Sequence, residues 1–413
     1  MRRLCTKLFV GAAACLFVSN ISSAKAGTET VLYSFCSQTN CADGDGPNAG
    51  LINVKGTLYG TTEYGGAYGG GTIFALDPTS GAETVLYSFC SQANCADGTA
   101  PKANLIHVGG KLYGETLSGG NNGYGTVFSL TLKTGTEKVL HSFCSQANCA
   151  DGATPYAGLL NVNGTLYGTA ANGGSLCMTN CGVVFALDRT TGQETVLHSF
   201  GNAPDGAEPF GQLLDVSGTL YGTTAMGGAS GLGTLFSLDL ATNAEQVLHS
   251  FAGGLDGISP ATQPIDVGGI LYGTTNFGGG NSCFDFNGCG TVYSFDPATG
   301  VETVLYRFCG QANCGDGWLS VASLINVKGK LYSTTLGGGT GNCTYYGIPG
   351  CGTVFAFDLK TGRESVTYPF CSLAGCVDGD QPPNDLINVN GTLYSVAYAG
   401  GANGAGVVFA FSP

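Results

Sequence analysis

The cysteines are the residues whose spacing most directly suggests chemistry. Of the 18 cysteines, Cys5 and Cys15 lie near the N-terminus and the others form eight close pairs: Cys36/Cys41, Cys90/Cys95, Cys144/Cys149, Cys177/Cys181, Cys283/Cys289, Cys309/Cys314, Cys343/Cys351 and Cys371/Cys376. Two copies of the surrounding pattern, at Phe200 and Phe251, lack both members of the pair, and no copy has only one. Loss of both members together indicates local disulfides, because a single unpaired thiol would be reactive in an oxidising compartment. Zinc is the competing interpretation, but a structural zinc ion needs four ligands, and each loop supplies two, with the next pair expected on another blade. We therefore predict eight local disulfides and no metal ion.

Asp-Gly dipeptides recur once in each copy of the same pattern. The aspartates are Asp43, Asp97, Asp151, Asp205, Asp256, Asp316 and Asp378. Seven carboxylates gathered at the mouth of a channel would hold a cation such as calcium. The dipeptide is also typical of a turn, in which aspartate accepts hydrogen bonds from backbone N–H groups and glycine adopts positive φ. Because a feature present in every repeat is usually part of the architecture, we favour the turn and keep the cation ring as the alternative.

The four histidines do not form a recognisable catalytic or metal-binding motif. His141, His198 and His249 occupy a position that is tyrosine in the other copies, which indicates a packing role. His107 has no second histidine nearby, and there is no Gly-x-Ser-x-Gly nucleophile motif. Hydrolases that need histidine are therefore disfavoured. Catalysis by two carboxylates, as in glycosidases, stays open.

Four short strings, each recurring seven times in a fixed order, must position these residues. Their first copies are ETVLYSF at Glu29, LINV at Leu51, LYGTT at Leu58 and GTIFALD at Gly71. Each string alternates and is rich in Val, Ile, Thr, Tyr and Phe, which is typical of a half-buried β-strand. The sequence therefore predicts seven copies of a four-stranded antiparallel unit.

A unit of 51 to 62 residues with four such strands has the size of a propeller blade. The chain after residue 26 begins with an outermost strand, residues 29–35, and ends with a third strand, residues 406–411, that has no fourth. If the first strand completes the last blade, no strand edge stays exposed. We therefore predict an all-β, seven-bladed β-propeller as a single domain over residues 27–413, with blades at about 51–89, 105–143, 159–200, 213–251, 264–308, 324–370 and 386–411.

The string GTLYGTTEYGGAYGGGTIFALDPTSGAETVLYSF, which begins at Gly56, resembles the Gloeo/Verruco (GloVer) tandem repeat of secreted and surface proteins of bacteria. The resemblance extends over residues 27–413, because LYGTT, GG, GTVF and DG recur together in order. It implies an exported, propeller-like bacterial protein and supplies no catalytic residues. Members of that family often have a C-terminal anchoring segment, whereas this sequence ends at Ser412-Pro413, so we expect no surface anchor.

Charge and hydropathy restrict the location and the partners. Residues 1–26 have the features of an export signal, with a basic start, an apolar stretch at residues 8–18 and an Ala24-Lys25-Ala26 cleavage site. No other stretch has the apolar length of a membrane helix. The formal net charge of −13 argues against nucleic acid as a partner. We expect a monomer that is secreted, either extracellular or periplasmic, and has no membrane span.

Binding is expected on the face that carries the loops after LYGTT and after ETVLYSF, because these loops are long and variable. One sector of that face departs from the repeat and carries Phe284, Asp285, Phe286, Trp318, Tyr345 and Tyr346. Rigid aromatic side chains suit stacking against a sugar, although the same rings could simply cover glycine-rich backbone. We therefore predict a binding or scaffold propeller for carbohydrate or another extracellular ligand. The alternative is an extracellular carbohydrate-active or lactone-hydrolysing enzyme that uses carboxylates at the channel mouth.

Overall fold

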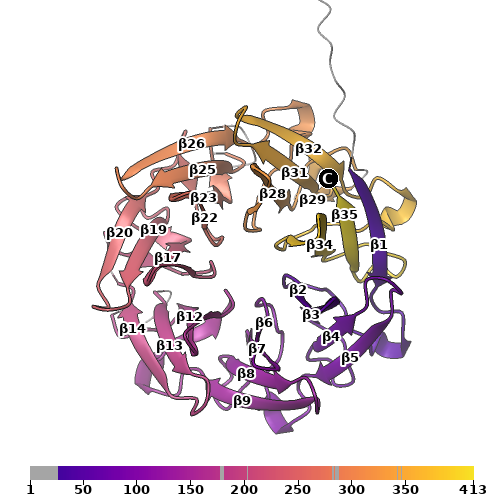
Figure 1. The fold of residues 1–413 in the computed structure, drawn as a ribbon, viewed down its shortest axis with the longest axis vertical. Helices are drawn as coiled ribbons and strands as arrows, with labels where there is room; N and C mark the ends of the chain where they lie inside the picture. The colour runs from indigo at the N-terminus through magenta and orange to yellow at the C-terminus, as the bar shows by residue number, and fades with distance from the viewer. Residues whose placement is uncertain are drawn as a thin grey trace, which may run out of the picture.

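The chain folds into a ring of seven antiparallel sheets around a central hollow (Figure 1). The computed structural model describes residues 27–176, 181–201, 203–280, 283, 288–341, 343–345 and 347–413, so the export signal predicted for residues 1–26 lies outside the described residues. Six sheets have four strands each, and the seventh gains the short β10. The seven-bladed β-propeller predicted from the repeat is confirmed.

In every blade the strands follow one another from the centre of the ring outward. Blades 1 to 3 consist of β2 (Ile52–Val54), β3 (Thr57–Thr62), β4 (Thr72–Leu76) and β5 (Glu83–Ser88); β6 (Ile106–Val108), β7 (Lys111–Thr116), β8 (Thr126–Thr131) and β9 (Thr136–Ser142); and β11 (Leu160–Val162), β12 (Thr165–Asn172), β13 (Val183–Asp188) and β14 (Glu194–Ser199). Blades 4 and 5 consist of β16 (Leu214–Val216), β17 (Thr219–Thr224), β19 (Thr234–Asp239) and β20 (Glu245–Ser250); and β22 (Ile265–Val267), β23 (Ile270–Thr275), β25 (Thr291–Asp296) and β26 (Val301–Arg307). Blades 6 and 7 consist of β27 (Ile325–Val327), β28 (Lys330–Thr335), β31 (Thr353–Asp358) and β32 (Arg363–Pro369); and β33 (Ile387–Val389), β34 (Thr392–Ala397), β35 (Val407–Ser412) and β1 (Thr28–Ser34).

Short elements occupy the loops between these strands. The short strands are β10 (Ala153–Pro155), β15 (Gly206–Ala207), β18 (Met226–Gly227), β21 (Gly257–Ile258), β24 (Phe277–Gly278), β29 (Thr344–Tyr345) and β30 (Ile348–Pro349). Single 3-10 turns follow the outermost strands of five blades: η1 (Thr39–Cys41), η2 (Ala93–Cys95), η3 (Ala147–Cys149), η4 (Ala312–Cys314) and η5 (Ala374–Cys376). Each of these turns ends at the second cysteine of a pair, so the cysteine loop is compact.

The ring closes through its first and last strands. β1 pairs with β35 in antiparallel register, with Glu29 opposite Phe411 and Val31 opposite Phe409. In Figure 1 the indigo β1 lies beside the yellow β35, so the two ends of the chain share one blade. The predicted closure is confirmed, and it gives β35 the partner that it would otherwise lack on its outer edge.

The hydrophobic core consists of clusters that join facing surfaces of neighbouring blades. One cluster combines Ile73 and Phe89 of blade 1 with Leu112 and Phe128 of blade 2, all with no exposed surface. Phe89 meets Phe128 edge to face, with ring centroids 5.0 Å apart, and equivalent pairs recur between the other blades. The glycine of LYGTT makes room for these rings, because a Cβ at Gly60 would lie 2.6 Å from Phe74 Cζ.

Candidate functional site

The cysteine loops, the Asp-Gly turns and the Gly-rich loops lie together on one face of the ring, as predicted. The backbone N–H of Gly66, in a Gly-rich loop, donates to the carbonyl of Cys41 at 2.9 Å. Asp45 and Tyr64 exchange two backbone hydrogen bonds of 3.0 Å, and equivalent bridges join Trp318 to Gly337 and Asp380 to Ala399. Each Gly-rich loop is therefore held by backbone hydrogen bonds to the neighbouring cysteine loop or Asp-Gly turn. This pairing makes the face more rigid than its glycine content suggests.

Each Asp-Gly turn is built around a carboxylate that accepts several local hydrogen bonds. Asp43 is fully buried, and its Oδ2 accepts from Tyr33 OH and Ser37 N, both at 2.8 Å, while Oδ1 accepts from Gln38 N at 3.1 Å. Burial opposes ionisation of Asp43, but the hydrogen bonds from Tyr33 and Ser37 outweigh it and lower the pKa. Gly44 has φ +107°, as a turn glycine should, whereas Gly206 and Gly257 do not adopt positive φ, so that part of the prediction is wrong in two turns.

The seven turn aspartates do not form the cation ring that was kept as the alternative. In every copy the carboxylate faces the outermost strand of its own blade and accepts from local donors there. Five of the seven are fully buried. The physical reason is that each carboxylate already accepts hydrogen bonds from donors of its own repeat, which hold it away from the centre of the ring.

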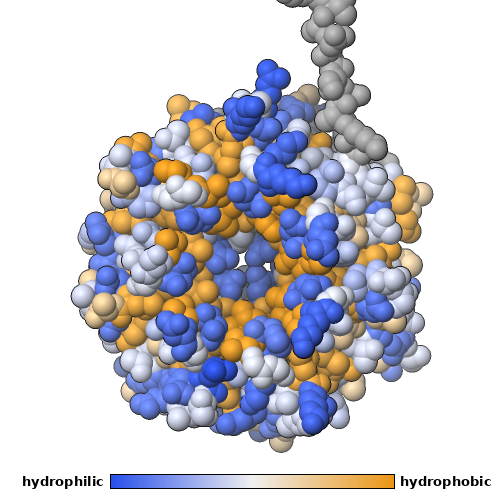
Figure 2. All heavy atoms as spheres, viewed as in Figure 1, coloured by the Kyte–Doolittle hydropathy of each residue, from blue (hydrophilic) through white to orange (hydrophobic). Residues whose placement is uncertain are grey.

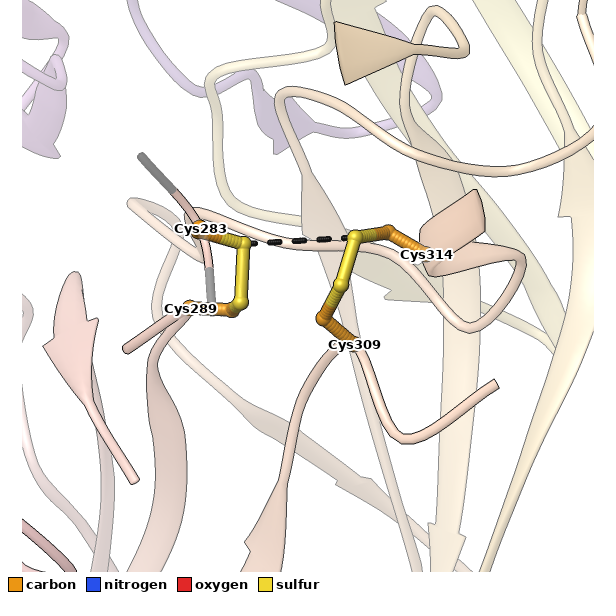
Figure 3. A group of neighbouring side chains, drawn as sticks. All are labelled: Cys283, Cys289, Cys309 and Cys314. Carbon is orange, nitrogen blue, oxygen red and sulfur yellow. Dashed lines mark hydrogen bonds between the residues drawn. A yellow bond between two sulfur atoms is a disulfide. The ribbon is translucent and has the colours of Figure 1, made fainter. Parts of the chain in front are cut away.

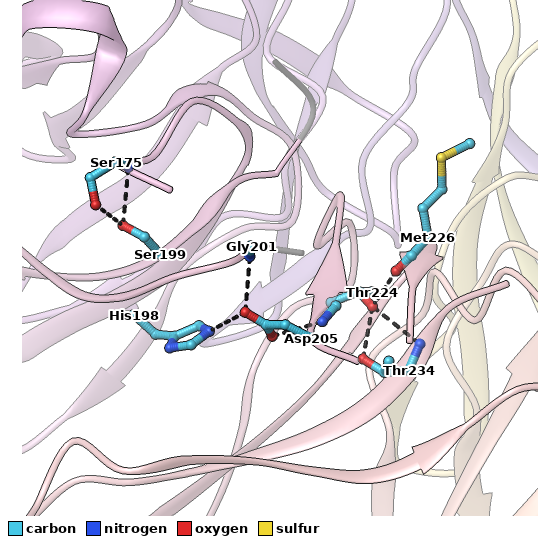
Figure 4. A network of polar contacts seen from close by, with 9 residues as sticks. Ser175, His198, Ser199, Gly201, Asp205, Thr224, Met226 and Thr234 are labelled. Atoms are coloured by element: carbon cyan, nitrogen blue, oxygen red, sulfur yellow. Dashed lines mark hydrogen bonds and ion pairs between the residues drawn. The ribbon is translucent and has the colours of Figure 1, made fainter. Parts of the chain in front are cut away.

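Three turns use histidine in place of tyrosine beside the aspartate. His198 Nε2 lies 3.2 Å from Asp205 Oδ2 (Figure 4), and the corresponding distance from His249 to Asp256 is 3.3 Å. The ring of His198 also packs edge to face on Phe200 at 4.8 Å, so the predicted packing role is present. Sequence analysis did not predict the contact between histidine and aspartate. A signal for it was present, because tyrosine or histidine stands seven or ten residues before the turn aspartate in every copy.

The disulfides form within the predicted pairs wherever both cysteines are described. Seven pairs are bonded: Cys36–Cys41, Cys90–Cys95, Cys144–Cys149, Cys283–Cys289, Cys309–Cys314, Cys343–Cys351 and Cys371–Cys376. Cys181 is also disulfide-bonded, and its predicted partner Cys177 lies outside the described residues.

The expectation that successive cysteine pairs lie on different blades is wrong at two places. The Sγ atoms of Cys343, Cys351 and Cys371 lie within 4.8 Å of one another, and those of Cys283 and Cys314 are also close. Cys283 Sγ is 3.9 Å from Cys314 Sγ, so the Cys283–Cys289 and Cys309–Cys314 bridges are neighbours (Figure 3). The reason is antiparallel pairing within blade 5, because the loop before β25 and the loop after β26 emerge at the same end of the sheet.

The aromatic sector predicted to bind a ligand is described only in part. Phe284, Asp285, Phe286 and Tyr346 lie outside the described residues, and Tyr345 contributes its backbone to the pairing of β29 with β30. Trp318 is only 2 % exposed and packs in the core cluster with Leu331 and Phe355. Its indole lies over Gly337, where a Cβ would overlap the ring. The face of this tryptophan is therefore used for packing.

A funnel of about 580 Å³ lies at the centre of the loop face. Figure 2 shows the ring hollowed at its centre, with hydrophilic and hydrophobic residues mixed around the opening. Much of the lining comes from the segment that leads into each innermost strand, and the rest includes Asn276, Leu336 and Tyr398 from the loops that follow the second strands. Two positions of this segment recur in the lining. Rim positions are Asn48, Lys102, Tyr156, Phe210, Ala261, Val321 and Pro383. Belt positions, two residues later, are Gly50, Asn104, Gly158, Gln212, Gln263, Ser323 and Asp385, of which Gly50 and Gly158 do not line the funnel.

Hydrogen bonds join the belt positions from blade to blade. Asn104 accepts from Gly50 N at 2.6 Å, and its Nδ2 donates to Asp385 Oδ2 at 2.8 Å. The other carboxylate oxygen of Asp385 accepts from Ser323 N at 2.6 Å. On the opposite side, Gln212 Nε2 donates to the carbonyl of Leu159 at 2.6 Å. The belt thus fixes the wall of the funnel with amide and carboxylate groups from different blades.

The rim has a polar sector and an aromatic sector. Lys102 Nζ is 2.8 Å from Glu63 Oε1, and Asn48 Nδ2 donates to Glu63 Oε2 at 3.0 Å. The same Lys102 ammonium lies 6.0 Å from the ring centroid of Tyr156, which packs edge to face on Phe210 at 5.4 Å. A planar apolar surface and charged or amide groups therefore face one hollow, which is the composition of a site for a polar ligand with one apolar face.

Sequence reasoning missed this funnel, although a signal for it is present. The alanine and the leucine around the belt position recur in most copies, whereas the belt and rim residues differ from copy to copy. A position that varies between repeated residues is not required by the blade fold, so its side chain is free to serve binding.

One glutamate stands behind the funnel wall. Glu115 replaces the first threonine of LYGTT, is fully buried, and accepts from Gly158 N through Oε2 at 3.0 Å. In blade 1 the equivalent Thr61 instead donates to the carbonyl of Pro101 at 2.9 Å. Burial raises the pKa of Glu115 to about 8, so this carboxyl is mostly protonated at neutral pH.

The fold and the funnel define a seven-bladed propeller whose loop face, stapled by disulfides, carries a central ligand-sized hollow. The Gloeobacter/Verrucomicrobia repeat model matches residues 17–178, 92–286 and 284–413, and the chain belongs to that family. No helix among the described residues is long and apolar enough to span a membrane. A search of curated proteins found no match.

Solved structures share the propeller architecture at low sequence identity. The extracellular domain of a protein described as a hybrid two-component system from B. thetaiotaomicron has a TM-score of 0.58 and 10 % identity, and the match covers 94 % of this chain and 40 % of that chain. The mitotic checkpoint complex matches with a TM-score of 0.55 and 11 % identity, covering 99 % and 98 % of the two chains. An oligogalacturonate lyase in complex with manganese matches with a TM-score of 0.51 and 12 % identity, covering 94 % and 96 %. These likenesses concern the fold alone.

Proposed function

We propose that this chain is a secreted binding propeller that takes a carbohydrate into the central funnel of its loop face. The observation that carries the proposal is that Tyr156 and Phe210 line the same hollow as the polar groups of Asn48, Lys102 and Asn104, with Lys102 next to Tyr156. A sugar ring has an apolar face that stacks on an aromatic ring and a rim of hydroxyl groups that bind amides and charged groups. The funnel volume of about 580 Å³ also lies in the range of small-molecule sites.

Secretion is supported by the disulfides. Many bridges in one chain persist only in an oxidising environment, and the predicted leader at residues 1–26 would deliver the chain there. The rigid loop face favours binding as well, because loops held by bridges and backbone pairing lose little conformational entropy when a ligand arrives.

The enzymatic alternative is a carbohydrate-active or lactone-hydrolysing enzyme that uses carboxylates at the channel mouth. Hydrolysis of a glycosidic bond in this way needs two carboxyl groups that flank the bond. Among the described residues that line the funnel, Asp385 is the only acidic one. Both of its carboxylate oxygens already accept hydrogen bonds, from Asn104 and Ser323 of the belt. Glu115 has the raised pKa of a general acid, but it is fully buried behind the wall. We therefore favour binding over catalysis.

A glycan array on the purified mature protein tests the proposal. We expect a restricted set of glycans to bind, and Tyr156→Ala to weaken binding at least tenfold. Tyr68→Ala is the matched control, because Tyr68 is 60 % exposed on a Gly-rich loop and does not line the funnel. Both variants should melt at the temperature of the parent protein. Absence of glycan binding, or equal loss in the two variants, would overturn the proposal.

A further inference from the structure

Every junction between blades brings a glutamate toward a turn aspartate of the preceding blade. In blades 3 and 4 a histidine lies beside that aspartate, and no cysteine pair follows the outermost strand. The pairs are His198 with Asp205 (Figure 4) and His249 with Asp256. The next blade supplies Glu245 to the first group and Glu302 to the second. One imidazole and two carboxylates therefore meet twice at the outer side of the ring.

The spacing of these atoms is that of ligands around one ion. In each group one nitrogen and two carboxylate oxygens lie within 4.8 Å of one another. The distances from His198 to Asp205 and from His249 to Asp256 are 3.2 and 3.3 Å. Two atoms bonded at 2.0–2.1 Å to a tetrahedral zinc ion lie about 3.3 Å apart. By contrast, a charge-assisted hydrogen bond from nitrogen to carboxylate is usually about 2.7–2.9 Å long.

The third ligand of each group has an oxygen available for an ion. Oε1 of Glu245 and Oε1 of Glu302 are buried and have no hydrogen-bond partner among the described residues. The same holds for the equivalent glutamate at every other junction, so what distinguishes these two groups is the histidine that completes a set of three ligand atoms within 4.8 Å of one another. His198 and Asp205 are about one fifth exposed, at 20 % and 19 %, so an ion can enter from solvent. The aspartate is already oriented, because Asp205 accepts from the backbone N–H groups of Gly201 and Gly206 at 2.9 and 2.7 Å.

We propose that His198, Asp205 and Glu245, and one blade further His249, Asp256 and Glu302, form two sites for a divalent transition-metal ion of the zinc type. Imidazole with carboxylates suits zinc, whereas calcium and magnesium take oxygen ligands only. Three protein ligands leave one position for water. The net charge of −13 also attracts cations to the surface.

The sites lie where a staple is missing. The two loops after β14 and β20 lack the cysteine pair that closes the equivalent loop after β1, β5, β9, β26 and β32. A metal ion held by His249, Asp256 and Glu302 would tie the loop to its own blade and also to the next blade. Metal coordination thus replaces the disulfide in these two blades.

The chain contains matched controls for both sites. Tyr306 occupies the position of the histidine and donates to Asp316 at 2.7 Å, so a tyrosine at this position can bond to the turn aspartate without offering an imidazole, in a turn that is three residues longer. His141 also lies near an aspartate and a glutamate, Asp151 and Glu194. In the described part of the chain, however, the side-chain nitrogen and oxygen atoms of these three residues do not all lie within 4.8 Å of one another. His198→Tyr and His249→Tyr therefore remove a ligand with little change in packing, and His141→Tyr should leave metal binding unchanged.

Zinc titration of the metal-free, oxidised protein by calorimetry, with metal content checked by mass spectrometry, tests the proposal. We expect two ions per chain, one in each single variant at His198 or His249, none in the double variant, and two in His141→Tyr. Zinc should raise the melting temperature of the parent protein and not that of the double variant. Binding that persists in the double variant, or no zinc binding by the parent protein, overturns the proposal. Glycan binding is read separately in the same variants, so failure of these sites leaves the funnel proposal untouched.

Discussion

Glu83, on the outermost strand of blade 1, is held beside the buried carboxylate of Asp43, which belongs to the turn after β1. Burial, together with the charge of Asp43, raises the pKa of Glu83 from its usual 4.5 to about 7. The same arrangement recurs at every junction, where Glu29, Glu137, Glu194, Glu245, Glu302 and Glu364 also have a pKa near 7. Ionisation of a glutamate is therefore unfavourable at each of the seven junctions of the propeller.

This repetition predicts that the protein is most stable in mild acid. A glutamate with a raised pKa contributes stability that is complete below pH 4.5 and is lost as the pH rises through about 7. Asp43 and Asp97, whose pKa values are lowered, contribute stability that is complete above pH 3.8 and is lost in stronger acid. The optimum is thus expected near pH 4 to 4.5.

Thermal unfolding in metal-free buffer measures this dependence. Allowing for partial exposure, each junction contributes about 0.5 kcal/mol, so the melting temperature should fall by roughly 5 °C between pH 4.5 and pH 8. Glu83→Gln should stabilise the protein at pH 8 and leave it unchanged at pH 4.5. A melting temperature that rises toward pH 8 would contradict the burial of these carboxyl groups.

Glu115→Gln isolates a second buried carboxyl group. The introduced amide keeps an oxygen that accepts from the Gly158 N–H and never ionises, whereas Glu115 in the unfolded chain is ionised at neutral pH. Because burial raises the pKa of Glu115 to about 8, the variant should be more stable by about 2 kcal/mol at pH 7 and by less than about 1 kcal/mol at pH 4.5. Denaturant unfolding at the two pH values checks this. Equal effects at both would mean that the carboxyl group is hydrated.

Removal of β1 should open the ring. A chain that begins at Ala42 loses the pairing of Glu29 with Phe411 and of Val31 with Phe409, and it also exposes the edge of β35. We expect a loss of several kcal/mol or aggregation through that edge. The mature chain, which begins at Gly27, is the control. Equal melting of both chains would show that closure contributes little.

The bridges predict a mass and a peptide map. The unreduced protein after residue 26 should lack sixteen hydrogens, because sixteen cysteines remain there. Peptides should be linked within the predicted pairs, including Cys177 with Cys181. The neighbouring bridges at Cys283 and Cys314 are the sensitive test, since a link between them would reveal exchange.

Loss of one bridge should be tolerated. Replacing Cys90 and Cys95 together by alanine opens a small loop and should cost about 2 kcal/mol without changing the fold. The turn itself keeps the hydrogen bonds from Tyr87 and Ser91 to Asp97. Circular dichroism and denaturant unfolding report both effects, and collapse of the whole propeller would contradict a merely local role.

The sequence by itself determined the features that are encoded within one repeat. Four alternating strings specify four strands, the unpaired first and last strings specify how β1 closes the ring, and the distance from Cys36 to Cys41 specifies a local bridge. These features depend on backbone pairing and turns over a few residues, which local residue types prescribe. They were predictable for that reason.

Only the tertiary structure decided what meets between repeats. Asn104 and Asp385 are 281 residues apart, yet they share a hydrogen bond in the belt. Trp318 packs in the core, although its departure from the repeat suggested a ligand site. Glu83 lies beside Asp43, although its position is ordinary as a local pattern. Such contacts depend on the curvature of the ring and on how facing blades pack, and these arise from the summed volumes of buried side chains.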